Sequence, residues 1–137
     1  MARDTIVITE PDRQKLTALI QDLRDRGEEI THANELAQEL ARARIVAPEE
    51  TDPGVITMNS RFRLTDLDDK ETEEYTLVFP QEADIEKRRI SVLSPVGTGL
   101  LGYRKGDVVE WTVPAGKRRL KIDAILYQPE AAGDRHL

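Results

Sequence analysis

The first fifty residues place their apolar side chains at intervals of three and four, a spacing typical of helices that bury one face. The first inner stripe consists of Leu16, Leu19, Ile20 and Leu23. The hydroxyl of Thr9 suits a helix cap, and Pro11 fits a first helical turn. Gly27 then favours a stop. These signals predict a helix that begins after Thr9 and ends near Gly27.

A second helix is predicted to begin at Thr31 and to end near Val46 or Ala47, because Pro48 disfavours helix in the residue before it. Its inner stripe consists of Ala33, Leu36, Ala37, Leu40, Ala41 and either Ala43 or Arg44. Two helices with so short a link form an antiparallel hairpin. Arms of about 13 to 16 residues are roughly 20–24 Å long. Isolated helices of this length are only marginally stable, so we expect the hairpin to pack against the rest of the protein.

From Thr57 onward the apolar positions alternate, which is typical of strands with one buried face. Five alternating segments are predicted as strands, and they lie within 57–64, 75–79, 90–92, 109–113 and 120–126. Between the third and fourth strands, Ser94 as a cap and Pro95 in a first turn predict a short helix.

The predicted fold class is therefore α+β, with a short antiparallel helical hairpin followed by a five-stranded antiparallel sheet and a short helix. We divide the chain into an N-terminal hairpin, residues 1–50, and a C-terminal sheet domain, residues 51–137. The boundary is predicted within 47–55, which contains two prolines and a glycine.

Composition narrows the classes of function. The chain of 137 residues has no cysteine and two histidines, which excludes disulfides and thiolate chemistry. A zinc site would need both histidines together with carboxylates, which is unusual, so we expect no metal and no cofactor. No apolar run approaches the ~20 residues that cross a bilayer, and the amino terminus lacks the apolar core of a secretion signal. We expect a cytoplasmic protein without a membrane partner.

Charge is sorted along the chain more strongly than its net value of -6 indicates. Residues 52–86 carry 3 basic and 10 acidic groups, whereas residues 87–121 carry 9 basic and 2 acidic groups. We expect part of the basic block to pair with the acidic block across the sheet. The alternative is a basic surface that complements an acidic protein or nearby nucleic acid. The net acidity disfavours nonspecific nucleic-acid binding as the main function.

A set of turn motifs in the sheet domain carries a family resemblance. The set consists of Ser94-Pro95-Val96-Gly97, Leu100-Leu101-Gly102, Gly106-Asp107-x-Val109 and Pro114-Ala115-Gly116. It resembles the carboxy-terminal domain of the bacterial Gre transcript-cleavage factors, which has an FKBP-like fold. Residues 57–61, the ending 127–134 and the short hairpin are in turn similar to the Rnk family of regulators of nucleoside diphosphate kinase.

The resemblance implies RNA polymerase as the partner. Gre factors sit at the mouth of the polymerase secondary channel, where their globular domain grips rim helices of the largest subunit. By this resemblance the polymerase-binding residues are Ser94, Pro95, Val96 and Gly97. The protein would contact nucleic acid only indirectly, through the polymerase.

The hairpin departs from the Gre pattern. In Gre factors a far longer coiled-coil hairpin carries acidic residues to the polymerase active site, where they help to bind magnesium. Here the arm is short and its tip is mixed in charge, with Arg24, Asp25, Arg26, Glu28 and Glu29. We therefore expect a noncatalytic regulator that binds near the secondary channel and competes with Gre-type factors without stimulating transcript cleavage. The tip residues are a candidate for a further polymerase contact.

The residues also leave alternative functions to consider. The alternative from the family name is a direct protein–protein regulator of nucleoside diphosphate kinase, although no residue argues for contact with that enzyme. An isomerase pocket would use the aromatic residues Phe62, Tyr75, Phe79 and Trp111, which we expect to be core. His32 and His136 lack a phosphate cradle, and Ser94 lacks a base and an elbow motif. The chain is not expected to be an enzyme.

Overall fold

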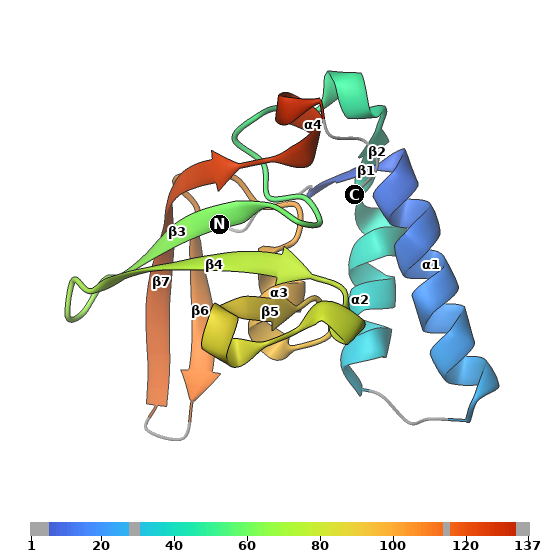
Figure 1. Cartoon of the computed structure of the whole chain (residues 1–137). Helices are drawn as coiled ribbons and strands as arrows, with labels where there is room; N and C mark the ends of the chain where they lie inside the picture. The colour runs from blue at the N-terminus through green and yellow to red at the C-terminus, as the bar shows by residue number, and fades with distance from the viewer. Residues whose placement is uncertain (1–5, 28–30, 114–115, 134–137) are drawn as a thin grey trace.

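The structure is a computed structural model that describes residues 6–27, 31–113 and 116–133. Its N-terminal part contains helices α1 (Glu10–Asp25) and α2 (Thr31–Arg42). The two helices run side by side in opposite directions, as a hairpin (Figure 1). The side-chain oxygen of Thr9 accepts a hydrogen bond from the Asp12 amide at 3.2 Å, with Pro11 in the first turn. The hairpin and the start of its first helix are thereby confirmed.

The end of the second helix differs from the prediction. Helix α2 stops at Arg42, and Arg44–Val46 instead forms strand β2, which pairs in parallel with β1 (Val7–Thr9). The Arg44 amide donates to the Ile6 carbonyl at 2.8 Å. Ile45 and Val46 are β-branched residues that fit a strand, and β1 offers them a buried ladder. The paired strands β1 and β2 therefore form the root of the hairpin, where the chain enters and leaves it.

The C-terminal part is built on a five-stranded sheet in the order β5-β4-β3-β7-β6. Its strands are β3 (Arg61–Asp66), β4 (Thr72–Val78), β5 (Arg89–Ser91), β6 (Val108–Val113) and β7 (Gly116–Tyr127). Neighbouring strands are antiparallel except for β4 and β5, which are parallel. The wholly antiparallel sheet of the prediction is wrong at this edge. The chain between them runs through two 3-10 turns, η2 (Pro80–Glu82) and η3 (Ile85–Lys87), and returns in the same direction.

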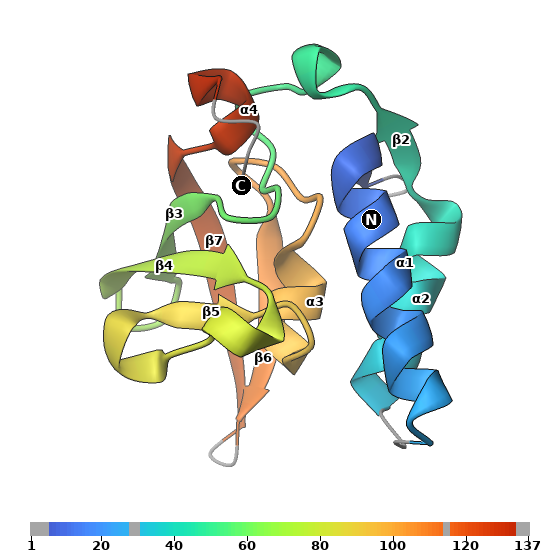
Figure 2. The ribbon, with the colours of Figure 1, turned by 45° about the vertical axis from the view of Figure 1, so that its right-hand side comes forward.

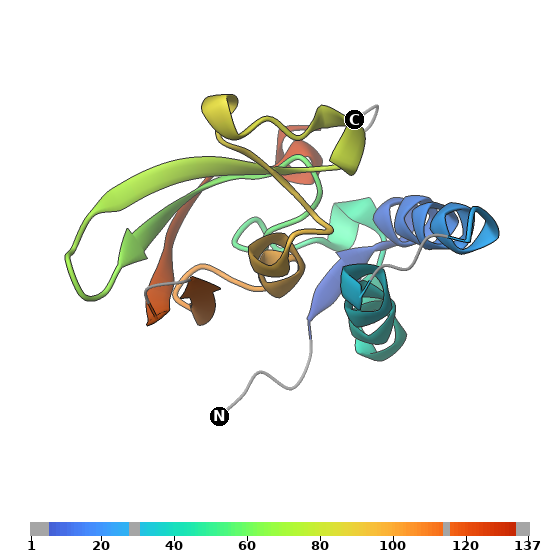
Figure 3. The same ribbon diagram turned by 90° about the horizontal axis from the view of Figure 1, so that it is seen from below.

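The sheet curls around helix α3 (Pro95–Leu100), which lies inside its curve (Figure 3). The largest buried side chains between them include Phe62, Leu77, Leu100 and Ile122. The alternating burial of β3, with Phe62 and Leu64 inward, follows from the period of two in the sequence. A short helix α4 (Pro129–Ala132) ends the described chain. The α+β fold class is confirmed.

The hairpin lies alongside the sheet domain (Figure 2). Leu16, Ile20 and Leu36 of the helices belong to the same buried cluster as Phe62 and Ile122 of the sheet. At the root, Gly102 has a φ of +84°, and a β-carbon there would lie 2.8 Å from the Ile6 β-carbon, so only glycine allows this close approach. Within the described ranges, none of the helices has the length and apolar character that crossing a membrane requires.

Candidate functional site

The turn before α3 is held by short-range hydrogen bonds. The Ser94 hydroxyl donates to the Ser91 carbonyl at 2.7 Å and accepts from the Gly97 amide at 3.0 Å. Thr98 donates from its hydroxyl to the Val92 carbonyl at 2.7 Å. A β-carbon on Gly97 would lie 2.1 Å from the Ser91 carbonyl oxygen, so the helix packs against the preceding strand more closely than any side chain allows. The predicted cap is confirmed.

The four predicted polymerase-binding residues differ in their access to solvent. Val96 and Gly97 are buried, and Ser94 is half-buried; the side chain of Pro95 lies outside the described set. Val96 contributes to the common core. Of the described side chains in this set, that of Ser94 is therefore the one that can touch a partner.

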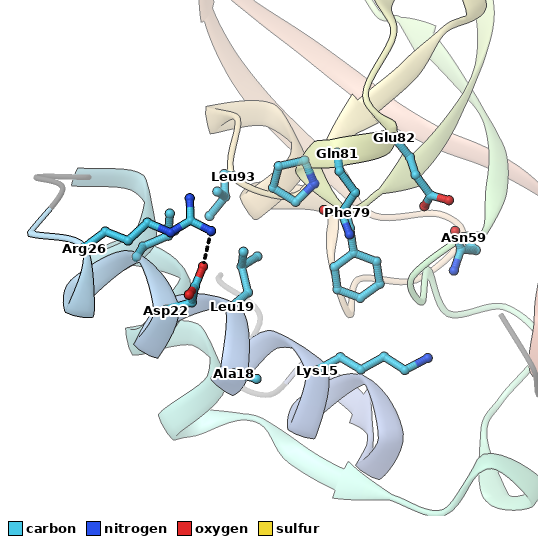
Figure 4. Close-up of a pocket in the computed structure, with 12 residues that line it drawn as sticks. Lys15, Ala18, Leu19, Asp22, Arg26, Asn59, Phe79, Gln81, Glu82 and Leu93 are labelled. Carbon is cyan, nitrogen blue, oxygen red and sulfur yellow. Dashed lines mark ion pairs between the residues drawn. The ribbon is translucent and has the colours of Figure 1, made fainter.

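Next to this turn, a groove of about 1040 Å³ runs between α1 and η2 (Figure 4). We call it the α1–η2 groove. Its apolar lining consists of Ala18, Leu19, Leu23, Phe79, Pro80 and Leu93. Its polar lining consists of Lys15, Asp22, Arg26, Asn59, Gln81 and Glu82. An apolar floor with a charged rim is the ordinary composition of a protein-binding groove.

The groove brings together two regions that are far apart in the sequence, the hairpin tip and the Ser94 turn. Arg26, from the hairpin tip, and Leu93, next to Ser94, both line it and lie at the same end of it in Figure 4. Phe79, Pro80 and Leu93 are not among the predicted site residues. Phe79 ends an alternating strand and is predicted to be core; it packs against the buried cluster and also lines the groove. A Phe-Pro pair directly after a strand was the available signal that the chain leaves the sheet there.

The described charges of the tip interact with other residues of the hairpin. Arg26 forms an ion pair with Asp22 at 2.6 Å, Arg24 donates to the Asn34 side chain at 3.4 Å, and Asp25 accepts from Gln21 at 2.9 Å. The other tip candidates, Glu28 and Glu29, lie outside the described residues. Among the residues that the structure describes, no group of three or more acidic or histidine side chains could hold a metal ion.

The two charge blocks pair across the sheet domain, as expected. Arg118 donates from Nε to Asp66 at 2.6 Å, and the hydrogen bonds to Asp66 from the Asp68 amide and from Arg118 lower the pKa of this carboxyl. Arg104 pairs with Asp52 at 3.2 Å, and Arg88 pairs with Glu73 at 3.1 Å. Partial internal pairing of the basic block is therefore confirmed.

A buried acid ties the hairpin to the sheet domain. Asp12 on α1 is 5% exposed, and its Oδ2 accepts from the Met58 amide at 3.0 Å. Burial, together with the nearby carboxylate of Glu130, raises the pKa of Asp12 to about 6. Glu130 in turn accepts from the Thr57 hydroxyl at 2.7 Å. The sequence pattern gave no sign of this contact, since Asp12 resembles any acidic residue of a first helical turn.

The described aromatic residues do not converge on one pocket. Phe62 is fully buried in the core, and Phe79 lines the α1–η2 groove. Tyr75 and Phe79 both pack against the core cluster that contains Phe62, as expected. The Tyr75 hydroxyl donates to Glu73, and burial and this hydrogen bond raise the pKa of Tyr75 to about 12. The side chains of His32 and Trp111, and all of His136, lie outside the described set.

Comparison with known proteins matches two parts of the chain to two different family models. The model of the GreA/GreB transcription elongation factor C-terminal region matches residues 50–127. The model of the Rnk N-terminus matches residues 4–46. The first match covers more than half of the chain, and places it in the class of Gre-type transcription factors.

Individual relatives indicate the same family. The regulator of nucleoside diphosphate kinase of Escherichia coli K12 is 40% identical over 135 residues, which is 98% of each chain. The transcription elongation factor GreA of Thermodesulfovibrio yellowstonii is 34% identical over 94 residues, or 69% of this chain and 60% of that protein. The chain thus belongs to the Rnk family, within the wider GreA/GreB family.

Solved structures show the same fold. A GreA/GreB transcription elongation factor from Nitrosomonas europaea superposes with a TM-score of 0.79 at 37% identity, over 91% of this chain and all of that one. The transcription factor Gfh1 gives a TM-score of 0.53 at 26% identity, over 93% and 100%. These relatives are named as regulators and transcription factors.

Proposed function

We propose that this protein is a noncatalytic transcription regulator that binds RNA polymerase. Its binding surface comprises the Ser94 turn and the adjoining α1–η2 groove, and its target is the rim of the secondary channel in the largest subunit. There it competes with Gre-type factors without stimulating transcript cleavage. The proposal is supported by the family membership and by the groove, which joins the Ser94 turn to the tip end of α1.

The size and position of the hairpin support the absence of cleavage activity. Helix α1 has 16 residues and is therefore about 24 Å long. Much of that length lies beside the sheet domain, because Leu16 and Ile20 of α1 are buried in the common core. An arm of which so little projects does not carry carboxylates deep into a channel. We assign the tip, Arg24 to Glu29, to contact with the polymerase surface.

The experiment is a competition for core polymerase between this protein and a GreA factor, followed by fluorescence anisotropy of the labelled factor. We expect displacement by the wild-type protein. Ala18→Glu adds a charge to an exposed wall of the groove and should weaken displacement about tenfold or more. Ala41→Glu, an exposed site on α2 that does not line the groove, is the matched control and should compete like the wild type.

Three outcomes would contradict the proposal. They are absence of binding to core polymerase at micromolar concentration, equal weakening by both variants, and stimulation of cleavage in halted elongation complexes. Ser94→Glu tests the turn in the same assay, with thermal unfolding as the check that the cap variant still folds. A change in nucleoside diphosphate kinase turnover on mixing purified proteins without polymerase would favour the alternative function.

A further inference from the structure

A row of four residues crosses the outer face of the sheet. In the strand register, Tyr127 of β7 lies opposite Arg61 of β3, Arg61 lies opposite Thr76 of β4, and Thr76 lies opposite Arg89 of β5. Residues paired across strands project from the same face. This is the face opposite Phe62, since burial alternates along β3 with Arg61 exposed and Phe62 buried.

The row lines a hollow of about 410 Å³. This hollow borders the α1–η2 groove, and Asn59 and Glu82 line both. The remaining lining residues are Val78 and Leu126. Arg61 and Arg89 stand on either side of Thr76, two strand spacings or about 10 Å apart at the backbone. Their long side chains can therefore converge above the Thr76 hydroxyl.

Both guanidinium groups are available to a ligand. Within the described part of the chain, neither Arg61 nor Arg89 has a side-chain hydrogen bond or ion pair. The adjacent arginines, in contrast, form ion pairs. Arg63 lies 3.9 Å from Glu74 and 3.9 Å from Asp123, and Arg88 is paired with Glu73. Among the residues that line the hollow, Glu82 is the one acidic group, so the positive charge of the two arginines exceeds the negative charge.

We propose that this hollow binds the terminal phosphate of a phosphorylated small molecule of about mononucleotide size. Guanidinium forks match the oxygens of phosphate, and a dianionic terminal phosphate gains more from two of them than a phosphodiester does. The volume is in the range of small-ligand sites, and Val78, Leu126 and the Tyr127 ring supply an apolar floor for the organic part. Because both arginines are exposed, binding is weak and salt-dependent.

This site does not rest on the polymerase proposal, and either can fail without the other. The test is a titration of the full-length protein at low ionic strength, followed by amide chemical shifts in NMR. Pyrophosphate and ADP should shift the signals of Asn59, Thr76 and Arg89, whereas adenosine should not. An oligoribonucleotide of four residues without terminal phosphates should bind more weakly than ADP, and tighter binding would overturn the small-molecule assignment.

Variants separate a built site from the general field of a basic surface. Arg61→Gln and Arg89→Gln should each weaken ADP binding about tenfold, as expected for loss of a charge-assisted hydrogen bond. Glu82→Gln should tighten binding, because it removes the opposing charge. Arg63→Gln, on the same face but already neutralised, is the control and should leave the affinity unchanged. Equal weakening by Arg63→Gln, or no shifts at several millimolar pyrophosphate, would overturn the proposal.

Discussion

At the scale of single residues, Asp12 carries the largest electrostatic consequence of the fold. Its carboxyl is buried against the loop that leads into β3, where it accepts the Met58 amide hydrogen. The charged and polar groups that act on it are Glu130, Lys15 and Thr9. Burial dominates over these and raises the pKa to about 6, so the folded protein holds this proton more tightly than the unfolded chain does.

Stability should therefore fall as the pH rises through about 6. The stabilising effect of the protonated Asp12 is complete below its unfolded pKa of ~3.9 and is lost above the folded value. Asp12→Asn keeps an acceptor for the Met58 amide without the charge. We expect the variant to exceed the wild type by about 2–3 kcal/mol in unfolding free energy at pH 7.5 and to approach it near pH 4. Urea unfolding at both pH values measures this, and a pH-independent difference would contradict the assignment.

At the scale of elements, helix α3 shows how closely a helix can approach the preceding strand. Two of its glycines look equivalent in the sequence. The structure distinguishes them. A β-carbon added at Gly97 would collide with the Ser91 carbonyl, whereas one added at Gly99 would have no atom within 4 Å. The close approach at Gly97 holds the Ser94 turn, which is the candidate polymerase contact, against β5.

The two glycines should respond in opposite directions to the same substitution. Gly97→Ala forces backbone to move and should cost about 2 kcal/mol or more of unfolding free energy. Gly99→Ala adds a better helix former in open space and should stabilise by about 0.5–1 kcal/mol. Thermal unfolding of the pair measures the difference. Similar losses in both variants would show that helix propensity, not the close approach, determines the effect.

The elements also show what a sequence can and cannot predict here. The caps Thr9 and Ser94 and the period of two in the strands predicted most elements, because these signals are local. The early end of α2 and the parallel β4–β5 pair were missed, since both depend on a partner strand distant in sequence. The α1–η2 groove was missed for the same reason: Leu93 and Arg26 are brought together only by packing.

At the scale of the whole molecule, the hairpin and the sheet domain share one buried cluster. Two units that match different family models are thus expected to unfold together. Leu36 on α2 is fully buried within this cluster. Its loss should lower the stability of the strands as much as that of the helices.

Leu36→Ala should cost about 3 kcal/mol without separating the two units. Unfolding followed by helical circular dichroism and by fluorescence of Trp111, the single tryptophan and a residue of β6, should give coincident transitions. Gln38→Ala, at an exposed site on the same helix, serves as the control and should change little. Two resolved transitions would contradict a common core.

The paired root of the hairpin has a consequence for the length of the arm. Strand β1 leads into α1 and strand β2 follows α2, so both ends of the arm are anchored side by side in one parallel ladder. Residues added at the far end therefore leave the body of the protein undisturbed. Seven residues inserted in each helix would extend the reach by about 10.5 Å. Arm length is thus an adjustable quantity in this architecture, and reach can change while the grip on a partner stays the same.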